Sequence, residues 1–427
     1  MEPNQNPRPV VGLLGATGIT GRVALTHLLA RAPEAGADVV VGARDPERVR
    51  ALCAERDLPA PEVLPADIAD PDSLRAFVRR VDVLVNLAGP YTRLAPPVLA
   101  ACVAEGTHYV DVTGESQLAH RTDRDLHEAA RAAGVAIVHT AGFEALPADV
   151  LVDAARRHAA ARGEVLRTAD LVTSVCTPPG TGFSESVSGG TVQSLVEVLR
   201  DPDPARTGDV AARLPEPAPG TGTASDPDAV RAFSPLRLRA RTADGRVLAP
   251  MSPLAAINPP VVHRTQALSP VAGAAAHPVA FREATAMGRS GGPRGAGRLL
   301  AAEAVAAFQT FAGLATGLPH PVRARLADVL AGVLPQVGTG PEGDVLTGWS
   351  WTTRGVFTTH EGSSFPAVLE AQGNPGYGTT PWLTTELALR MAVRGVPDAA
   401  LGSTTPALAL DGDVDALRPA RVHITVG

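Results

Sequence analysis

The stretch Gly12-Leu-Leu-Gly15-Ala-Thr-Gly18-Ile-Thr-Gly21 decides the fold. It overlaps the end of a short apolar run, Val10–Leu14, and precedes an amphipathic stretch, Arg22–Ala30. In such a strand–turn–helix unit, glycines let the backbone approach a pyrophosphate, and the helix N-terminus offers free N–H groups to that anion. The pattern therefore predicts a dinucleotide site. The residues expected to contact the cofactor here are Gly12, Gly15, Ala16, Thr17, Gly18, Ile19 and Thr20.

Short apolar runs alternate with helical stretches along the first third of the chain. The further strands expected are Val39–Val41, Glu62–Leu64, Val81–Val85, His108–Val112 and Val135–His139. Strands that alternate with helices form a parallel sheet wound on both faces, so residues 1–145 are predicted to form an N-terminal Rossmann domain. Residues 146–370 lack this alternation and are expected to form a second, α+β substrate domain. For residues 371–427, a return to the Rossmann domain is one expectation. The predicted fold class is therefore α/β.

Composition excludes several kinds of protein. The chain has 427 residues, of which 45% are hydrophobic and 19% charged, as in globular proteins. A net charge of -6 argues against nucleic acid as a partner. Cys53, Cys102 and Cys176 lie far apart with no CxxC, so neither a metal site nor a disulfide scaffold is expected. Together with a start that lacks a signal-peptide pattern, this predicts a cytoplasmic protein. The sequence leaves the oligomeric state open, with a homodimer as one expectation.

Lysine is absent from the chain, and all 38 basic residues are arginine. Schiff-base chemistry needs an amine nucleophile, and a Walker-type phosphate loop needs its lysine. The Tyr-x-x-x-Lys pair of short-chain dehydrogenases is excluded for the same reason. The dinucleotide-binding turn must therefore work without a lysine partner.

The end of the second strand favours NADPH as the cofactor. Sites for NAD place an acid there to bind the ribose hydroxyls, whereas this chain has Arg44, which can pair with a 2′-phosphate. Asp45 is expected to cap a helix over Pro46–Leu52 instead. Asp67, after the third strand, is a further candidate cofactor contact.

Polar loops follow the fourth and fifth strands. Ligands of open parallel sheets bind beyond the carboxyl ends of the strands, so these loops are expected to border the cofactor. The candidates for cofactor binding are Asn86, Gly89, Pro90, Tyr91 and Asp111. For Asp111 the alternative is loop capping. Tyr109, His139 and Cys102 are expected to be buried structural residues.

Three motifs in the first 150 residues carry a resemblance to a known family: GATGITG at residues 15–21, NLAGPYTRLAPPVLAACVAEGTHYVDVTGE at 86–115, and AGFEALPADV at 141–150. Four later motifs carry it further along the chain: SGGTVQSLVEVL at 188–199, PPVVHRTQAL at 259–268, NPGYGTT at 374–380 and STTPALAL at 403–410. The chain resembles the saccharopine dehydrogenase-like reductases, and within them the trans-acting enoyl reductases. The family pattern has Asp-Ser where this chain has Glu144-Ala145, which weakens any acid or substrate role for that loop.

The resemblance implies an NADPH-dependent enoyl reductase. Such an enzyme reduces a carbon–carbon double bond in a polyketide or lipid-like acyl chain, either as a small molecule or carrier-bound, with a polyketide synthase as its partner in trans. Reduction of a C=N or C=O bond, and a non-catalytic nucleotide-binding protein, remain alternatives.

Reduction of an enone needs a donor for the developing enolate oxygen and a source of a proton. Tyr91 and Glu115 are the candidate catalytic residues, with packing and loop capping as their respective alternatives. Phe143, Thr191 and Arg264 are candidate substrate contacts. For Arg264 the alternative is a structural ion pair, and for Thr191 it is a helix cap.

Two stretches in the second half have distinct textures. Leu299–Leu318 carries one charge, Glu303, and is expected to form a buried helix. A surface that touches lipid or an acyl chain, and a membrane span, are its alternatives. Asp201–Asp228 is rich in Pro, Gly and Asp and is expected to be a long loop.

Overall fold

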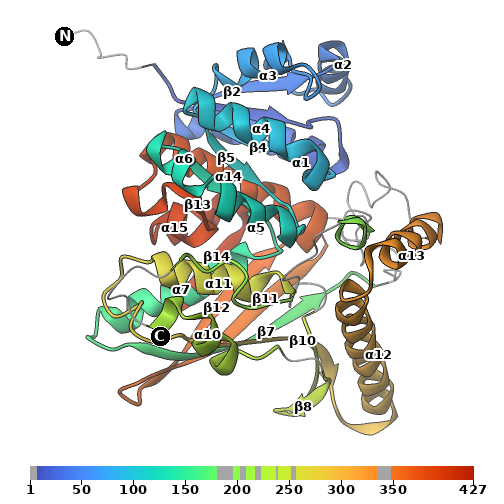
Figure 1. Cartoon of the computed structure of the whole chain (residues 1–427), viewed down its shortest axis with the longest axis vertical. Coiled ribbons are helices and arrows are strands. Elements are labelled where there is room, and N and C mark those ends of the chain that lie inside the picture. Colours follow the sequence, from blue (N-terminus) through green and yellow to red (C-terminus); the bar gives the residue numbers. More distant parts are fainter. Residues whose placement is uncertain are drawn as a thin grey trace.

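Two seven-stranded sheets, one above the other in Figure 1, organise the molecule. The computed structural model describes residues 7–179, 196–201, 208–216, 223–236, 239–251, 256–333 and 348–427. Six strands of the first sheet come from residues 10–138 and its seventh, β13, from residues 402–404, whereas the second sheet is formed by strands between residues 166 and 426. This arrangement confirms the predicted fold class.

The first sheet is parallel throughout, in the order β13-β6-β5-β4-β1-β2-β3. Its strands are β1 (Val10–Leu14), β2 (Asp38–Ala43), β3 (Glu62–Pro65), β4 (Val83–Asn86), β5 (His108–Asp111), β6 (Ala136–Val138) and β13 (Gly402–Thr404). The N-terminal region is therefore a Rossmann-type sheet.

Helices cover both faces of this sheet, which explains why its strands are apolar without alternation. Val83 and Val85 of β4 join one buried cluster, while Leu84 between them joins another on the opposite face. The first face is covered by α1 (Ile19–Ala35), α2 (Pro46–Glu55) and α14 (Thr380–Arg394). The second is covered by α3 (Pro71–Val78), α4 (Tyr91–Glu105), α5 (Ser116–Asp125) and α6 (His127–Ala132).

The C-terminal part of the chain comes back to the first domain. β13 pairs in parallel with β6, and α14 packs against α1. Glu386 of α14 accepts a hydrogen bond from Arg31 of α1 at 2.9 Å. The two halves of the chain are therefore interlocked.

The second sheet is mixed, in the order β14-β12-β11-β7-β10-β9-β8, with only β7 and β10 parallel to each other. Its strands are β7 (Leu166–Cys176), β8 (Arg241–Ala243), β9 (Arg246–Ala249), β10 (Ala280–Arg289), β11 (Ser350–Thr359), β12 (Ser364–Gln372) and β14 (Val422–Val426). Its helices include α7 (Leu146–Ala160), α10 (Pro227–Phe233), α11 (Asn258–Leu268) and α15 (Pro406–Leu410). One continuous apolar cluster contains both Val85 of the first sheet and Trp351 of the second, so the domains share a core.

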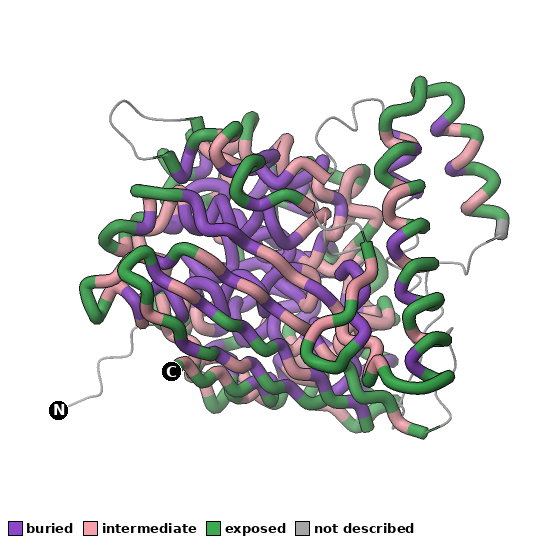
Figure 2. Tube along the Cα trace, turned by 90° about the horizontal axis from the view of Figure 1, so that it is seen from below, coloured by how far each residue is buried: buried purple, intermediate pink, exposed green. Residues whose placement is uncertain are grey.

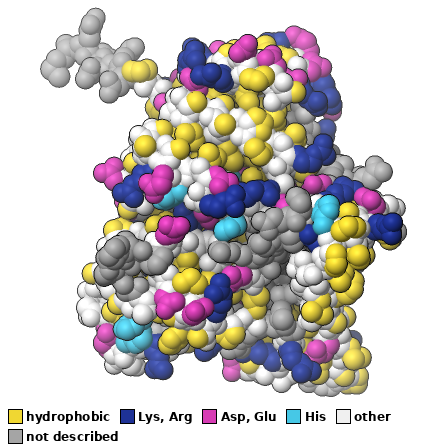
Figure 3. Space-filling view, viewed as in Figure 1, with side chains coloured by type: hydrophobic (Ala, Val, Ile, Leu, Met, Phe, Trp, Pro, Cys, Tyr) yellow, Lys and Arg dark blue, Asp and Glu magenta, His cyan; other side chains and the backbone are white. Residues whose placement is uncertain are grey.

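The apolar stretch Leu299–Leu318 is not the buried helix expected. It forms most of α12 (Gly292–Thr316), which stands with α13 (His320–Val333) at the edge of the molecule, outside the buried core (Figure 2). Leu300 is 73% and Leu314 71% exposed. Hydrophobic side chains gather over α12 and α13 in Figure 3. The inward-facing residues of α12 are small, mostly alanines, so its large apolar side chains point outward. By length and composition alone, α12 could cross a membrane.

The expected loop Asp201–Asp228 is partly packed structure. Val210 and Ala211 are buried against Val230 of α10, which begins at Pro227. Residues 202–207 and 217–222 within this stretch lie outside the described part of the chain.

Candidate active site

The turn between β1 and α1 is shaped to receive a dinucleotide. Gly15 has φ +88°, and a Cβ there would lie 2.6 Å from the carbonyl carbon of Leu87. A Cβ on Gly21 would lie 2.0 Å from the Gly15 carbonyl oxygen. α1 begins at Ile19 with no side-chain cap and no acid in its first turn. The turn thus fits a pyrophosphate, because the first N–H groups of the helix are left for an anion.

The remaining residues predicted at this turn play different parts. Gly18, Ile19 and Thr20 form the accessible start of α1, as expected for cofactor contacts. Thr17 accepts a hydrogen bond from Arg22 Nε at its carbonyl oxygen, at 3.0 Å. Ala16 is buried beneath the turn. Gly12 lies inside β1, where an added Cβ would meet Val81 at 2.9 Å, so its place in the packing does not agree with the predicted cofactor contact.

Arg44 and its neighbours occupy the edge where a ribose phosphate would lie. Arg44 is exposed just beyond β2, and its guanidinium makes no hydrogen bond or ion pair within the described residues. Asp45 accepts a hydrogen bond from the Glu47 N–H at 3.1 Å and caps α2, as predicted. Asp67 accepts one from the Ala69 N–H at 2.9 Å, which places it in the turn before α3. Within the described part of the chain, the Arg44 guanidinium thus has no partner, whereas Asp45 and Asp67 accept hydrogen bonds from backbone N–H groups.

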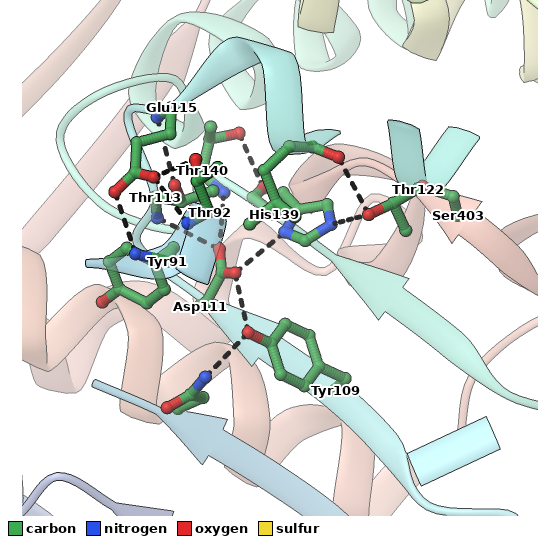
Figure 4. A network of polar contacts seen from close by, with 12 residues as sticks. Tyr91, Thr92, Tyr109, Asp111, Thr113, Glu115, Thr122, His139, Thr140 and Ser403 are labelled. Atoms are coloured by element: carbon green, nitrogen blue, oxygen red, sulfur yellow. Dashed lines mark hydrogen bonds and ion pairs between the residues drawn. The ribbon is translucent and has the colours of Figure 1, made fainter. Parts of the chain in front are cut away.

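A buried polar network lies at the carboxyl ends of β4, β5 and β6 (Figure 4). Tyr109 donates a hydrogen bond to Asp111 at 2.9 Å, and Asn86 donates one to the Tyr109 hydroxyl at 2.9 Å. His139 Nδ1 lies 2.8 Å from Asp111, and its Nε2 lies 3.0 Å from Thr122. Tyr109 and His139 are fully buried, as expected.

The same network corrects two predicted cofactor contacts. Asp111 and Asn86 are fully buried, and both face side chains of the network rather than an open cleft. The alternative reading of Asp111 as a capping residue is the one observed, because its Oδ1 accepts a hydrogen bond from the Thr113 N–H at 3.0 Å. Their role is to fix the strand ends.

Glu115 caps α4. Its two carboxylate oxygens accept hydrogen bonds from the N–H groups of Tyr91, at 2.9 Å, and Thr92, at 2.6 Å, and from the Thr92 hydroxyl. Burial raises the pKa of Glu115, and these hydrogen bonds oppose that rise. The predicted catalytic role is therefore not supported, since both oxygens are held by α4.

Tyr91 sits at the first position of α4, half-buried, next to the accessible loop residues Gly89 and Pro90. Burial is the main cause that raises its pKa well above 10, and the charges of Asp111, Glu144 and Glu115 add to the rise. A backbone hydrogen bond at Val112 acts in the opposite direction. The hydroxyl therefore stays protonated at neutral pH and can donate a hydrogen bond, but it cannot act as a base.

Glu144 is the acid at this edge that the sequence analysis discounted. It follows β6, and its Oε2 atom is buried without a hydrogen-bond partner among the described residues. Burial raises its pKa to about 7, with a further contribution from the charge of Asp111. The AGFEALPADV motif was the signal in the sequence that could have identified Glu144. Whether its Oε2 atom finds a hydrogen-bond partner depends on the folded structure.

The predicted substrate residues divide. Phe143 is partly buried, contacts the Trp351 ring edge-on with centroids 4.9 Å apart, and packs with Met251 and Ile257. A small cavity of about 10 Å³, room for one water, lies nearby between α5 and α11 and is lined in part by Ile257. Phe143 is thus part of a small apolar cluster. Thr191 lies outside the described residues.

The prediction for Arg264 is wrong. Its guanidinium is 2% exposed, pairs with Asp123 at 3.4 Å and donates to the carbonyl oxygens of Ser403 and Arg213, each at 2.6 Å. A buried arginine whose donors are taken up in this way is a structural tie between α11 and the first sheet.

Fold and site together define a class: a dinucleotide-binding Rossmann protein with an additional mixed-sheet domain. Comparison with known families makes this specific, because residues 11–138 match the saccharopine dehydrogenase NADP binding domain. The N-terminal domain is therefore similar to the NADP-binding domain of the saccharopine dehydrogenases, which supports the resemblance in this region.

Individual relatives extend the likeness. A candidate trans-acting enoyl reductase of Mycobacterium tuberculosis is 36% identical over 206 residues, 45% of this chain and 46% of the relative. A trans-acting enoyl reductase of Mycobacterium leprae is 34% identical over 215 residues, 48% of this chain and 49% of the relative. A saccharopine dehydrogenase-like oxidoreductase of Arabidopsis thaliana is 34% identical over 161 residues, 35% of this chain and 36% of the relative. The matched segments thus span about half the length of these relatives or less.

Proposed function

We propose that this protein is an NADPH-dependent reductase that acts on the carbon–carbon double bond of an α,β-unsaturated acyl chain. The observation that carries the proposal is the Tyr91 hydroxyl, kept protonated next to the loop that faces the dinucleotide turn. The names of the mycobacterial relatives support the same reaction.

When bound, NADPH supplies a hydride, which the reaction needs at the β-carbon of the substrate. The chain's own part is to hold the cofactor and to polarise the substrate. Gly15 and the start of α1 would receive the pyrophosphate, and Arg44 would pair with the 2′-phosphate.

Tyr91 would donate a hydrogen bond to the thioester oxygen as it gains enolate character. This role needs a group that stays protonated, and no lysine exists in the chain to lower the pKa of a tyrosine. The direction we infer is therefore consumption of NADPH for reduction, rather than removal of a proton from an alcohol.

An apolar substrate agrees with the residues at the domain boundary. Phe143, Met251 and Ile257 pack together there, and Trp351 backs the Phe143 ring. We propose a polyketide or lipid-like chain, delivered on a carrier by a synthase that lacks this reductive step. The thiols of Cys53, Cys102 and Cys176 are free, which accords with the cytoplasmic location we propose.

The runner-up is reduction of a C=N bond, which the name of the matched NADP domain brings forward. A substrate rich in carboxylates calls for convergent, available arginines. Arg264, the arginine of the PPVVHRTQAL motif, is paired with Asp123 and donates hydrogen bonds to two carbonyl oxygens. This observation favours the acyl substrate.

The test is a substrate panel with purified protein and NADPH. Crotonyl-CoA, a longer enoyl-CoA, acetoacetyl-CoA, and lysine with 2-oxoglutarate represent the C=C, C=O and C=N classes. We expect NADPH oxidation with the enoyl thioesters only. Oxidation with lysine and 2-oxoglutarate alone would support the runner-up.

A further inference from the structure

Three acids come together where β5 and β6 end, and one of them has an unsatisfied oxygen. Asp111 is hydrogen-bonded to Tyr109 and paired with His139, and Glu115 accepts three hydrogen bonds from α4. Glu144 Oε2 is buried and has no partner among the described residues. A buried polar atom left in this way needs an explanation, because it costs free energy that a partner would recover.

Among the described residues, Glu144 has no counter-ion. The charge that acts on it is that of Asp111, which is also negative. Its one stabilising hydrogen bond in the described region comes from its own backbone N–H. From α14, the neighbour of this loop is Thr380, a neutral side chain that accepts a hydrogen bond from the Phe143 N–H at 2.9 Å. The site therefore favours a neutral carboxylic acid.

The loop is built to admit this side chain. A Cβ on Gly142 would lie 2.4 Å from Glu144 Oε2 and 2.6 Å from Cγ2 of Thr380. Any residue other than glycine at 142 would displace the carboxyl group. The space beside the Gly142 backbone is thus occupied by the acid itself.

Glu144 also interacts electrostatically with Tyr91. The charge of Glu144 contributes to the raised pKa of the Tyr91 hydroxyl, which stands at the start of α4 across the strand ends. Phe143, which precedes Glu144 in the chain, packs against Met251 together with Ile257. The acid is therefore next in sequence to a residue of an apolar cluster, and its charge reaches the Tyr91 hydroxyl.

We propose that Glu144 is the proton donor of the reaction and delivers its carboxyl proton to the α-carbon of the reduced acyl chain. The inference rests on the proposed function. The α–β double bond accepts a hydride at the β-carbon, and its electron pair moves toward the α-carbon and the thioester oxygen. The O–H bond of Glu144 then breaks as a C–H bond forms at the α-carbon, which leaves a saturated chain and a glutamate that water re-protonates.

An acid whose pKa lies near the working pH is suited to this step, because it is protonated before the reaction and releases its proton readily. The pKa of about 7 that burial gives Glu144 agrees with such a role. The ionisable groups whose charges couple to Glu144 are Tyr91 of α4 and Asp111 of β5. Burial keeps the Tyr91 hydroxyl protonated, and Asp111 is paired with His139.

The test compares Glu144→Gln and Glu144→Asp with a matched control, Glu283→Gln. Glu283, on β10, is another buried carboxyl group, and its pKa is raised to about 8. It accepts a hydrogen bond from Asn258 at 2.8 Å. With crotonyl-CoA we expect kcat of Glu144→Gln to fall roughly 10²- to 10³-fold, with KM for NADPH unchanged. Wild-type kcat should fall as the pH rises through about 7, and the variant should lose this limb. Glu144→Asp should keep part of the rate.

A second readout does not depend on turnover. The infrared band of protonated carboxyl groups should titrate near pH 7 in the wild type and lose one component in Glu144→Gln. If the wild type reduces no enoyl thioester, the proposed function is refuted. If Glu144 is already ionised well below pH 7, its role as proton donor is refuted. The proposal is also overturned if Glu144→Gln keeps its rate and pH limb, or if Glu283→Gln loses them instead.

Discussion

The carboxylate of Glu115 accepts a hydrogen bond from the backbone N–H of Tyr91 at 2.9 Å, so the loop after β5 holds the first residue of α4. Residues 24 positions apart are tied at the edge of the sheet where the cofactor would bind. A helix N-terminus has unsatisfied N–H groups and partial positive charge, and a carboxylate satisfies both. The same contact fixes where the Tyr91 side chain leaves the backbone.

Removal of this cap should affect stability and rate together. Glu115→Ala should lower the free energy of unfolding by about 1–3 kcal/mol, because two N–H groups lose their acceptor. Turnover should fall as well, since Tyr91 is no longer anchored. Chemical denaturation and kcat measure the two effects, and Glu128→Ala, which removes an exposed carboxylate on α6, is the control. Unchanged stability in Glu115→Ala would contradict the capping role.

Arg44 should set the preference for NADPH. Its guanidinium is exposed and unpaired in the described part of the chain, so it is available to the 2′-phosphate. Wild-type protein should bind NADPH at least about tenfold more tightly than NADH, which is about 1.4 kcal/mol. Arg44→Ala should weaken NADPH binding and leave NADH binding unchanged. Fluorescence titration measures both affinities, with Arg56→Ala, at the far end of α2, as the control. Equal affinity of the wild type for the two nucleotides would refute the role of Arg44.

Tyr91→Phe should slow turnover roughly 10²-fold, the scale of losing one donor to a developing oxyanion. NADPH affinity and stability should change little, because the ring remains. Tyr109→Phe offers a contrast at the same edge: it should cost stability, since Asp111 and Asn86 both lose the Tyr109 hydroxyl. Full activity in Tyr91→Phe would show that Tyr91 is a packing residue only.

Three buried carboxyl groups should make the folded state less stable as the pH rises from about 4 to 8, and this effect opposes that of His263, whose pKa is lowered to about 3 by burial. Asp149, Glu144 and Glu283 have pKa values raised by burial to about 7, about 7 and about 8. Each therefore holds its proton in the folded state over a range in which the unfolded chain has lost it. Their contribution is fully present below the unfolded pKa and is lost as the pH rises through the folded value, by about 1.4 kcal/mol per pH unit for each group.

Asp149→Asn tests this sign. The variant should flatten the pH dependence of the free energy of unfolding, measured by denaturant titration from pH 5 to 8. Its neighbours Thr265 and Ala407 both donate to the carboxylate, so a loss of stability at low pH is expected alongside the flatter slope. If the slope equals that of the wild type, Asp149 does not contribute to the pH dependence of the free energy of unfolding.

Local signals predicted the first domain well. The turn at Gly15, the cap at Asp45 and the strand ends at Asn86 and Asp111 depend on neighbours within a few residues, which a sequence displays directly. The parallel sheet follows from their repetition along the chain. The return of residues 371–427 to the first domain was expected, but the strand β13 itself was not predicted. It is three residues long and pairs with β6, which is far away in the chain.

The sequence pointed to the loops of the candidate site but could not predict the partners of their side chains. Arg264 is tied to Asp123 by a pairing that no local pattern reveals. Asp111 has His139 as its partner across 28 residues, so its burial depends on the assembled sheet. The carboxyl group of Glu144 lies beside Gly142 and Thr380, and the contact with Thr380 depends on the folded chain. The exposure of α12 was missed because composition does not say which face of a helix meets the core.

An enoyl reductase delivers hydride to the β-carbon of an alkene. The most direct measurement is incubation with crotonyl-CoA and NADPH deuterated at C4, followed by location of the label in the product by NMR and mass spectrometry. We expect one deuterium at the β-carbon of butyryl-CoA and a solvent-derived proton at the α-carbon. Deuterium on a carbinol or amine carbon from the carbonyl or imine substrates, with crotonyl-CoA left unreduced, would contradict it.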